Sequence, residues 1–179
     1  MICLFTALEL PDTAKSYLAA TAGGVPGARW VPVENMHITL RFIGNVDEAT
    51  AGDLAAALAG VRGPAFDVDI EGAGYFSRGR KPTMLWAGVA RSDALAHLQE
   101  RIESVLVRAG AAPETRKFTP HVTLARLNGA PLARVEAFVA DHALMRLPAF
   151  RVSHFTLFAS YLGQDHPTYV AETNYPLED

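Results

Sequence analysis

Two short segments of the chain repeat one arrangement of residues that can transfer protons. HITL begins at His37 and HVTL begins at His121, so that each histidine is followed by a β-branched residue, a threonine and a leucine. Histidine can donate or accept a proton near neutral pH because its unperturbed pKa is about 6.5. A pair of histidines therefore suits a reaction that takes one proton and gives another. Phosphodiester hydrolysis is such a reaction, since water must lose a proton and the leaving oxygen must gain one.

The threonines of the two segments are candidate phosphate ligands. In a strand, residues i and i+2 point to the same face, so Thr39 is expected beside His37 and Thr123 beside His121. A threonine hydroxyl can donate a hydrogen bond to a non-bridging phosphate oxygen. The intervening apolar residues point the other way and can pack beneath helices. If the two segments are related by a pseudo-twofold axis, both histidine–threonine pairs meet across one cleft.

Structural roles and metal binding are the alternatives for the two histidines. One histidine at the start of a strand is more often structural, but two in the same frame favour a shared function. Catalytic zinc usually needs about three nitrogen, sulfur or carboxylate ligands, and neither segment contains an acidic residue. Cys3 is the one cysteine, which excludes an internal disulfide and a cysteine-based zinc site. We therefore predict no metal and no cofactor.

Composition indicates a soluble globular protein of 179 residues, of which 50% are hydrophobic and 20% are charged. The net charge of −3 argues against a protein that coats nucleic acids through bulk electrostatics, although a few arginines can still gather in one cleft. No apolar run is long enough to span a membrane. The N-terminal MICLFTALELP lacks the basic region and cleavage site of a signal peptide, so we expect a cytoplasmic protein.

The order of expected elements repeats in the two halves of the chain as strand, helix, histidine strand, helix and strand. This duplication predicts an α+β fold in which residues 1–179 form a single domain of two pseudo-symmetric lobes. We expect two antiparallel β-sheets facing a central cleft, with helices on the outside. Apolar and β-branched patterns place strands at 2–8, 37–44, 65–76, 83–90, 121–127, 149–160 and 167–177, and helices at 12–20, 48–60, 93–109 and 131–141.

Beyond the two motifs, the sequence resembles the two-histidine (2H) phosphoesterases, and within them the bacterial and archaeal RNA 2′,3′-cyclic phosphodiesterases formerly grouped as 2′-5′ RNA ligases. The resemblance covers LFTALELP, ENMHITLRFIGNV, LWAGV, RKFTPHVTLARL and FTLFAS, in that order along the chain. It implies a bilobal fold around a cleft and the metal-free opening of a terminal 2′,3′-cyclic phosphate to a 2′-phosphate. It also implies that His121 is the general base, that His37 is the general acid, and that Thr39 and Thr123 bind the phosphate.

The resemblance points to two flanking residues as well. Phe42 matches a position where an aromatic ring stacks on the terminal base, and Arg126 matches one where a cation meets phosphate. Both follow their histidine by five positions, so strict alternation turns them away from the cleft. They reach it only if the strands end or bulge near Arg41 and Ala125. Packing in the core is the alternative for Phe42.

Several alternatives stay open for the function and for other residues. The expected partners are RNA 3′ ends or small nucleotides bearing a 2′,3′-cyclic phosphate; the rival functions are 2′-5′ RNA ligation, hydrolysis of small cyclic nucleotides and non-catalytic binding of RNA ends. We expect a monomer without an obligate protein partner, since the duplication builds the site within one chain. Phe76 suits either base stacking or the core, the basic turn at 78–81 is expected to be solvated, and His166 is expected to be structural or at the surface.

Overall fold

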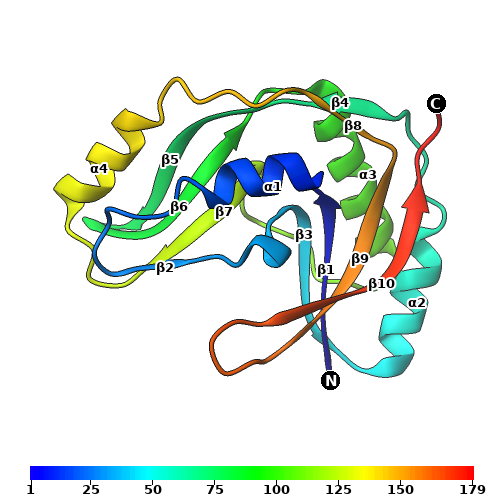
Figure 1. The fold of residues 1–179 in the computed structure, drawn as a ribbon. Coiled ribbons are helices and arrows are strands. Elements are labelled where there is room, and N and C mark those ends of the chain that lie inside the picture. Colours follow the sequence, from blue (N-terminus) through cyan, green and yellow to red (C-terminus); the bar gives the residue numbers. More distant parts are fainter.

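A computed structural model describes all residues, 1–179, as four α-helices arranged around a mostly antiparallel sheet (Figure 1). The strands are β1 (Ile2–Glu9), β2 (Ala28–Trp30), β3 (His37–Val46), β4 (Phe66–Val68), β5 (Ile70–Arg78), β6 (Lys81–Val89), β7 (His121–Leu127), β8 (Phe150–Val152), β9 (His154–Tyr161) and β10 (Thr168–Pro176). The helices are α1 (Asp12–Ala19), α2 (Glu48–Leu58), α3 (Asp93–Arg108) and α4 (Leu132–Asp141), with a 3₁₀ turn, η1, at Val33–Asn35.

The sheet differs from the expected pair of facing sheets. Strands β10, β9, β1, β3, β7, β6 and β5 are neighbours in that order, and β2 pairs with β7, so that one eight-stranded sheet results. The prediction of two substantial sheets is wrong, because the second sheet is only the two strands β4 and β8. The physical reason is the pairing of the two histidine strands themselves. They join at Ile38 and Val122, and this single residue pair makes the two groups of strands continuous.

The helices and the last strands pack against elements from the other half of the sequence. Helix α3 follows β6 in the chain but contacts β3 and α2, whereas α4 contacts β5 and β6. Strands β9 and β10, from the end of the chain, continue the sheet beside β1 (Figure 1). The predicted helices and strands occur in the predicted order, but β2 and η1 lie where no element was predicted, and the strands predicted at 65–76 and 149–160 are each divided into two. Each side of the sheet takes elements from both halves of the sequence. The assignment of residues 1–179 to one domain of pseudo-symmetric lobes stays a prediction.

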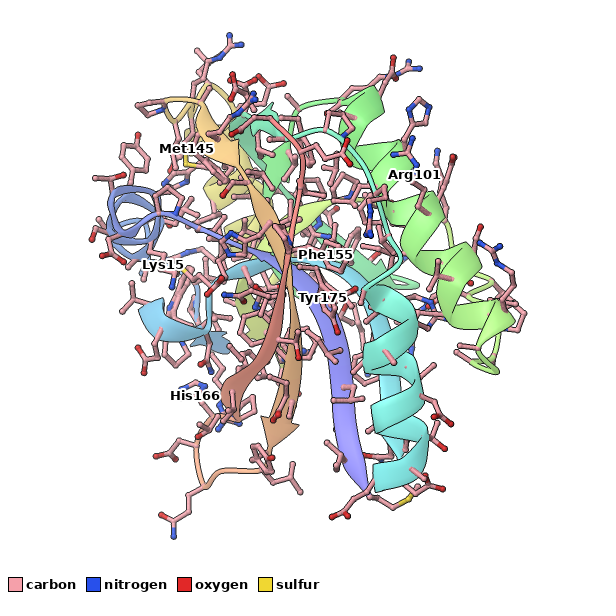
Figure 2. All side chains as sticks on the ribbon, turned by 90° about the vertical axis from the view of Figure 1, so that its right-hand side faces the viewer. Lys15, Arg101, Met145, Phe155, His166 and Tyr175 are labelled. Carbon is pink, nitrogen blue, oxygen red and sulfur yellow. The ribbon has the colours of Figure 1, made fainter.

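The buried faces of the two histidine strands follow the alternation that the sequence predicts. Ile38 and Leu40 are at most 3% exposed, and so are Val122 and Leu124. Each such aliphatic side chain contributes about 1.5–3 kcal/mol when it is fully buried. The same core continues toward α2, where Phe155 and Tyr175 stack with ring centroids 4.9 Å apart (Figure 2). The strands that carry the histidines are therefore fixed by a continuous apolar layer.

Two helices begin at side-chain caps. Asp47 accepts a hydrogen bond from the Thr50 amide at 2.7 Å, and Ser92 accepts one from the Leu95 amide at 3.2 Å. These bonds satisfy amide groups that the first turn of a helix leaves unpaired. No helix of the protein combines the length and the apolar character needed to cross a membrane.

Candidate active site

The junction of β3 and β7 brings the two histidine–threonine pairs together. Ile38 pairs with Val122 in an antiparallel arrangement. The residue before Ile38 therefore faces the residue after Val122, which places His37 toward Thr123 and Thr39 toward His121. All four side chains lie on the face of the strands opposite the buried aliphatic residues. The structure thus assembles the four residues that the sequence selected.

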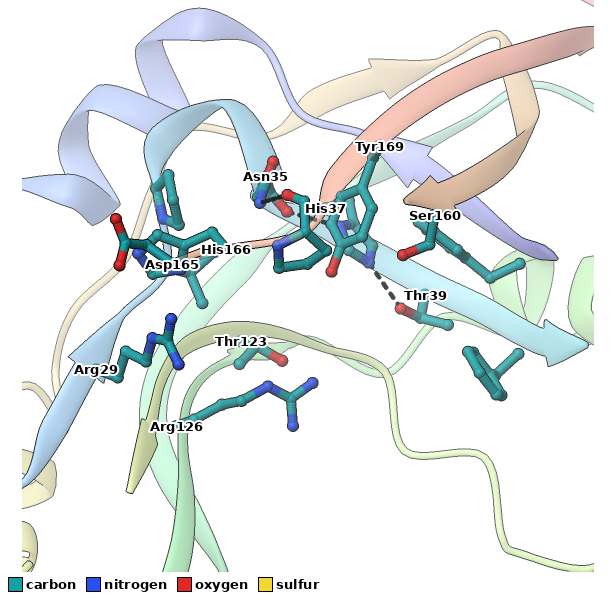
Figure 3. A pocket seen from close by; sticks show the side chains of 15 residues that line it. Arg29, Asn35, His37, Thr39, Thr123, Arg126, Ser160, Asp165, His166 and Tyr169 are labelled. Atoms are coloured by element: carbon teal, nitrogen blue, oxygen red, sulfur yellow. Dashed lines mark hydrogen bonds between the residues drawn. The ribbon is translucent and has the colours of Figure 1, made fainter. Parts of the chain in front are cut away.

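Two cavities border this junction. The first has a volume of about 340 Å³ and is lined by His37, Thr39 and Thr123 (Figure 3). The second has a volume of about 550 Å³ and is lined by Thr39 and His121. Thr39 and Phe42 border both cavities, so the two cavities meet between the two histidines.

Both histidine rings are held by the same backbone contact. His37 donates its Nδ1–H to the Asn35 carbonyl at 2.7 Å, and His121 donates its Nδ1–H to the Thr119 carbonyl at 2.6 Å. A carbonyl can only accept, so Nδ1 must carry the proton in each ring. The Nε2 atoms are then left for chemistry. The Nε2 of His37 lies 2.9 Å from the Thr39 hydroxyl, whereas that of His121 has no hydrogen-bond partner in the protein.

Aromatic rings surround each imidazole. Phe5 lies 5.0 Å and Tyr169 lies 5.4 Å from the ring of His37, measured between centroids. Phe76 stands edge-on to His121 at 5.0 Å, with Trp86 at 6.3 Å. Phe76, for which base stacking and core packing were open, therefore packs against a candidate catalytic residue. These rings remove water from the imidazoles.

The loss of water lowers the pKa of both histidines. Burial lowers the pKa of His37 from 6.5 to about 4, opposed by the Asn35 carbonyl and assisted by the neighbouring His121. Burial also lowers the pKa of His121, opposed by the Thr119 carbonyl. Both rings are therefore neutral at pH 7 in the free protein. A phosphodiester anion beside them raises the pKa of each ring, because a negative charge favours the protonated form.

Matching β-bulges bring Phe42 and Arg126 to the cleft. On β3, Thr39 is opposite Ala7 and Arg41 is opposite Thr6, which leaves Leu40 as an extra residue. An extra residue reverses the alternation that follows it. Phe42 is accordingly 51% exposed and borders both cavities, so core packing is the wrong interpretation of this residue.

The bulge on β7 occupies the equivalent position. Thr123 is opposite Trp86 and Ala125 is opposite Leu85, which leaves Leu124 as the extra residue. Arg126 is thereby exposed and lines the first cavity. The bulges that Phe42 and Arg126 need in order to reach the cleft are therefore present next to Arg41 in β3 and next to Ala125 in β7.

The first cavity also contains polar residues that the sequence did not select. Asn35 is 8% exposed, and its side-chain amide donates to the Pro167 carbonyl at 2.8 Å, which ties the β9–β10 connection to the segment that holds His37. His166 lines the cavity rather than a remote surface. The other polar residues of this kind are Arg29, Ser160, Asp165 and Tyr169. None of these residues belongs to either histidine motif, and only the order of the strands in the sheet brings them together.

The side chains do not gather into a metal-binding cluster. No three or more His, Cys, Asp or Glu side chains lie where they could hold one ion. Metal independence itself stays a prediction, to be tested with a chelator.

The chain is similar to proteins of one family. The family model for the 2′-5′ RNA ligase superfamily matches residues 12–164. The RNA 2′,3′-cyclic phosphodiesterase of Aeropyrum pernix is 36% identical over 148 residues, which are 82% of this chain and 84% of that protein. The RNA 2′,3′-cyclic phosphodiesterase of Thermotoga maritima is 37% identical over 147 residues, which are 80% and 76% of the two chains.

A solved structure shares the fold. The crystal structure of E. coli LigT complexed with 3′-AMP superposes with a TM-score of 0.80 at 23% identity, over 99% of both chains. The protein therefore belongs to the 2′-5′ RNA ligase superfamily of 2H phosphoesterases, and the resemblance seen in the sequence is confirmed.

The lowered pKa of His37 predicts a pH-dependent contribution to stability. The unfolded chain binds a proton at this residue below pH 6.5, whereas the folded chain binds one only below about pH 4. Protonation between these values favours the unfolded state, so His37 causes the free energy of unfolding to fall as pH drops from 6.5 to 4. Urea titrations of wild type and His37→Gln across this range measure the effect. We expect the variant to lose less stability on acidification; parallel curves would contradict the assignment.

Proposed function

We propose that the protein hydrolyses RNA terminal 2′,3′-cyclic phosphate to a 2′-phosphomonoester, without a metal ion, through His37 and His121. The observation that carries the proposal is the matched presentation of two imidazoles beside two threonine hydroxyls. Each ring is fixed through its Nδ1–H on a backbone carbonyl, which leaves Nε2 for proton transfer. Membership in a family that includes cyclic phosphodiesterases at 36–37% identity supports the substrate class.

The proposed step transfers two protons across one phosphate. Nε2 of neutral His121 takes a proton from water while the water oxygen attacks phosphorus. The bond from phosphorus to the 3′ oxygen breaks, and protonated His37 gives its Nε2 proton to that oxygen. Thr39 and Thr123 donate hydrogen bonds to the non-bridging oxygens. The Nε2 of His121, which has no partner in the protein, supports the assignment of His121 as the base.

The bound phosphate favours the protonated form of His37, the proposed acid. His37 is neutral above about pH 4 in the free protein. The anionic substrate raises its pKa and so supplies the protonated ring when it is needed. The dry aromatic surroundings of both rings strengthen that electrostatic coupling, since charges interact more strongly where water is excluded.

A second candidate function is 2′-5′ RNA ligation. The cavity beside His121 holds about 550 Å³ and is bordered by Phe76 and the cationic side chain of Lys117. It has room for a 5′-terminal nucleoside whose hydroxyl takes the place of water. His121 would then deprotonate that hydroxyl while its oxygen forms the new bond to phosphorus. The bond from phosphorus to the 3′ oxygen would break, and His37 would protonate that oxygen, which leaves a 2′-5′ linkage.

One incubation separates these functions. Purified protein in EDTA is mixed with a short RNA ending in 2′,3′-cyclic phosphate, with and without a second RNA bearing a 5′-hydroxyl, and the termini are identified by chromatography against 2′-phosphate and 3′-phosphate standards. We expect a 2′-phosphate in both mixtures, with at most a minor joined product. A 3′-phosphate would reject the leaving oxygen assigned above. Bound but unchanged RNA would favour a protein that only binds RNA ends.

A further inference from the structure

Two arginines face one another at one end of the first cavity. Arg29 of β2 is directly opposite Arg126 of β7 in the antiparallel register, and both side chains are exposed. Both line the cavity that contains His37 and Thr123. Figure 3 shows the two guanidinium groups near Thr123.

Like charges opposite one another in an antiparallel pair are destabilising. Neither Arg29 nor Arg126 forms an ion pair or a side-chain hydrogen bond, although the chain carries 19 acidic residues and a net charge of −3. Asp165 is the one carboxylate that lines the cavity, and it pairs with neither. An anion between the two guanidinium groups would turn this repulsion into attraction.

The pairing of β2 with β7 holds Arg29 beside Arg126. The Val31 amide donates to the Leu124 carbonyl at 2.9 Å, which fixes the end of β2 beside the bulge of β7. Trp30 points to the other face and packs on Phe138, with ring centroids 5.6 Å apart. Alternation then turns Arg29 to the cavity side. Trp30 lines neither cavity.

We propose that Arg29, together with Arg126, binds the phosphate on the 5′ side of the terminal ribose; this inference rests on the proposed function. When the cyclic phosphate lies at His37 and Thr123, the next anion of an RNA chain is that 5′ phosphate. A nucleoside 2′,3′-cyclic monophosphate has no such group. Arginine suits the task because its planar guanidinium donates two parallel hydrogen bonds to phosphate. The preferred substrate class is therefore an RNA 3′ end rather than a mononucleoside cyclic phosphate.

The test compares kcat/KM for adenosine 2′,3′-cyclic phosphate, the same compound with a 5′-phosphate, and the dinucleotide ending in the cyclic phosphate. For wild type, the 5′-phosphate and the dinucleotide are expected to raise kcat/KM by roughly ten- to a hundredfold, as charge-assisted hydrogen bonds do. Arg29→Ala is expected to remove most of this ratio, because kcat/KM for the two compounds with a 5′-phosphate should fall much more than kcat/KM for the simple compound. Arg29→Lys, which keeps a point charge, should retain part of it. Arg80→Ala, in the exposed basic turn, serves as the matched control.

The outcomes separate the two proposals. A wild-type enzyme that hydrolyses all three compounds equally overturns the 5′-phosphate site and leaves the proposed function standing. An Arg29→Ala variant that slows all three equally also overturns it, because Arg29 would then act on the cyclic phosphate or on folding. Loss of the ratio in Arg80→Ala as well would assign the preference to general surface charge. A wild type that opens none of the compounds overturns the proposed function and this site with it.

Discussion

Replacing His121 with alanine is expected to lower kcat/KM for opening an RNA terminal cyclic phosphate by about 10²–10⁴-fold, the usual contribution of one placed proton transfer. His121 has an unpartnered Nε2 and lines the second cavity beside Thr39, which borders both cavities. His37→Ala is expected to cause a loss of the same order. Losses from residues that act together are not additive, so the double variant should be little slower than either single one.

Binding and folding controls make this result specific to proton transfer. The His121→Ala variant should keep most of its affinity for the RNA end, because the threonines and arginines of the cavities remain. His97→Ala, on the exposed face of α3, should stay within a few-fold of wild type. Activity retained within tenfold in His121→Ala, with normal folding, would remove this residue from the chemistry.

The second large effect is expected from Arg41→Ala, as a loss of about 3 kcal/mol or more in the free energy of unfolding. Arg41 is 6% exposed and pairs with Glu103 of α3, and it also donates to the Phe42 and Ala112 carbonyls. Truncation leaves a partly buried carboxylate without its partner. The same Glu103 accepts the Glu114 amide at 2.8 Å, so the segment that leads to His121 loses its bond to Arg41 and keeps only its bond to an unpaired Glu103.

Urea unfolding measures this loss, and an exposed ion pair provides the comparison. Arg151 and Asp67 lie 3.6 Å apart with side chains more than half exposed, so Arg151→Ala should cost at most about 1 kcal/mol. The second histidine strand has Ala125 at the position equivalent to Arg41, which shows that the bulge itself does not need an arginine. If Arg41→Ala costs no more than Arg151→Ala, the buried pair does not support the site.

The chemistry of the site is local, and that part was predictable from the sequence. His37 and Thr39 are two positions apart on one strand, as are His121 and Thr123, so the rule of alternation alone places each pair on one face. The duplication of the frame then indicates that the pairs act together. The buried aliphatic residues between them confirm the same rule from the opposite face.

The sheet arrangement and the bulges depend on long-range pairing, which no local pattern contains. The single contact between Ile38 and Val122 turns two expected sheets into one. The extra residues at Leu40 and Leu124 become visible only against the partner strands. They decide that Phe42 and Arg126 face the cleft.

Residues contributed by other segments were missed for the same reason. Asn35 acts through its backbone carbonyl and through a bond to Pro167, neither of which depends on a motif. Arg29 lies on the short strand β2, and His166 lies in the connection between β9 and β10. Their place in the cavity follows from topology and not from spacing.

The pH dependence of kcat/KM, measured in EDTA on a short RNA ending in 2′,3′-cyclic phosphate, tests the paired-histidine mechanism most directly. This parameter reports the ionisation of the free enzyme. Because burial lowers the pKa of His37 to about 4 and also lowers that of His121, we expect a bell-shaped profile whose two limbs both lie below about pH 6.5. A profile that is flat between about pH 5 and 8, or activity that EDTA abolishes, would contradict a metal-free histidine pair.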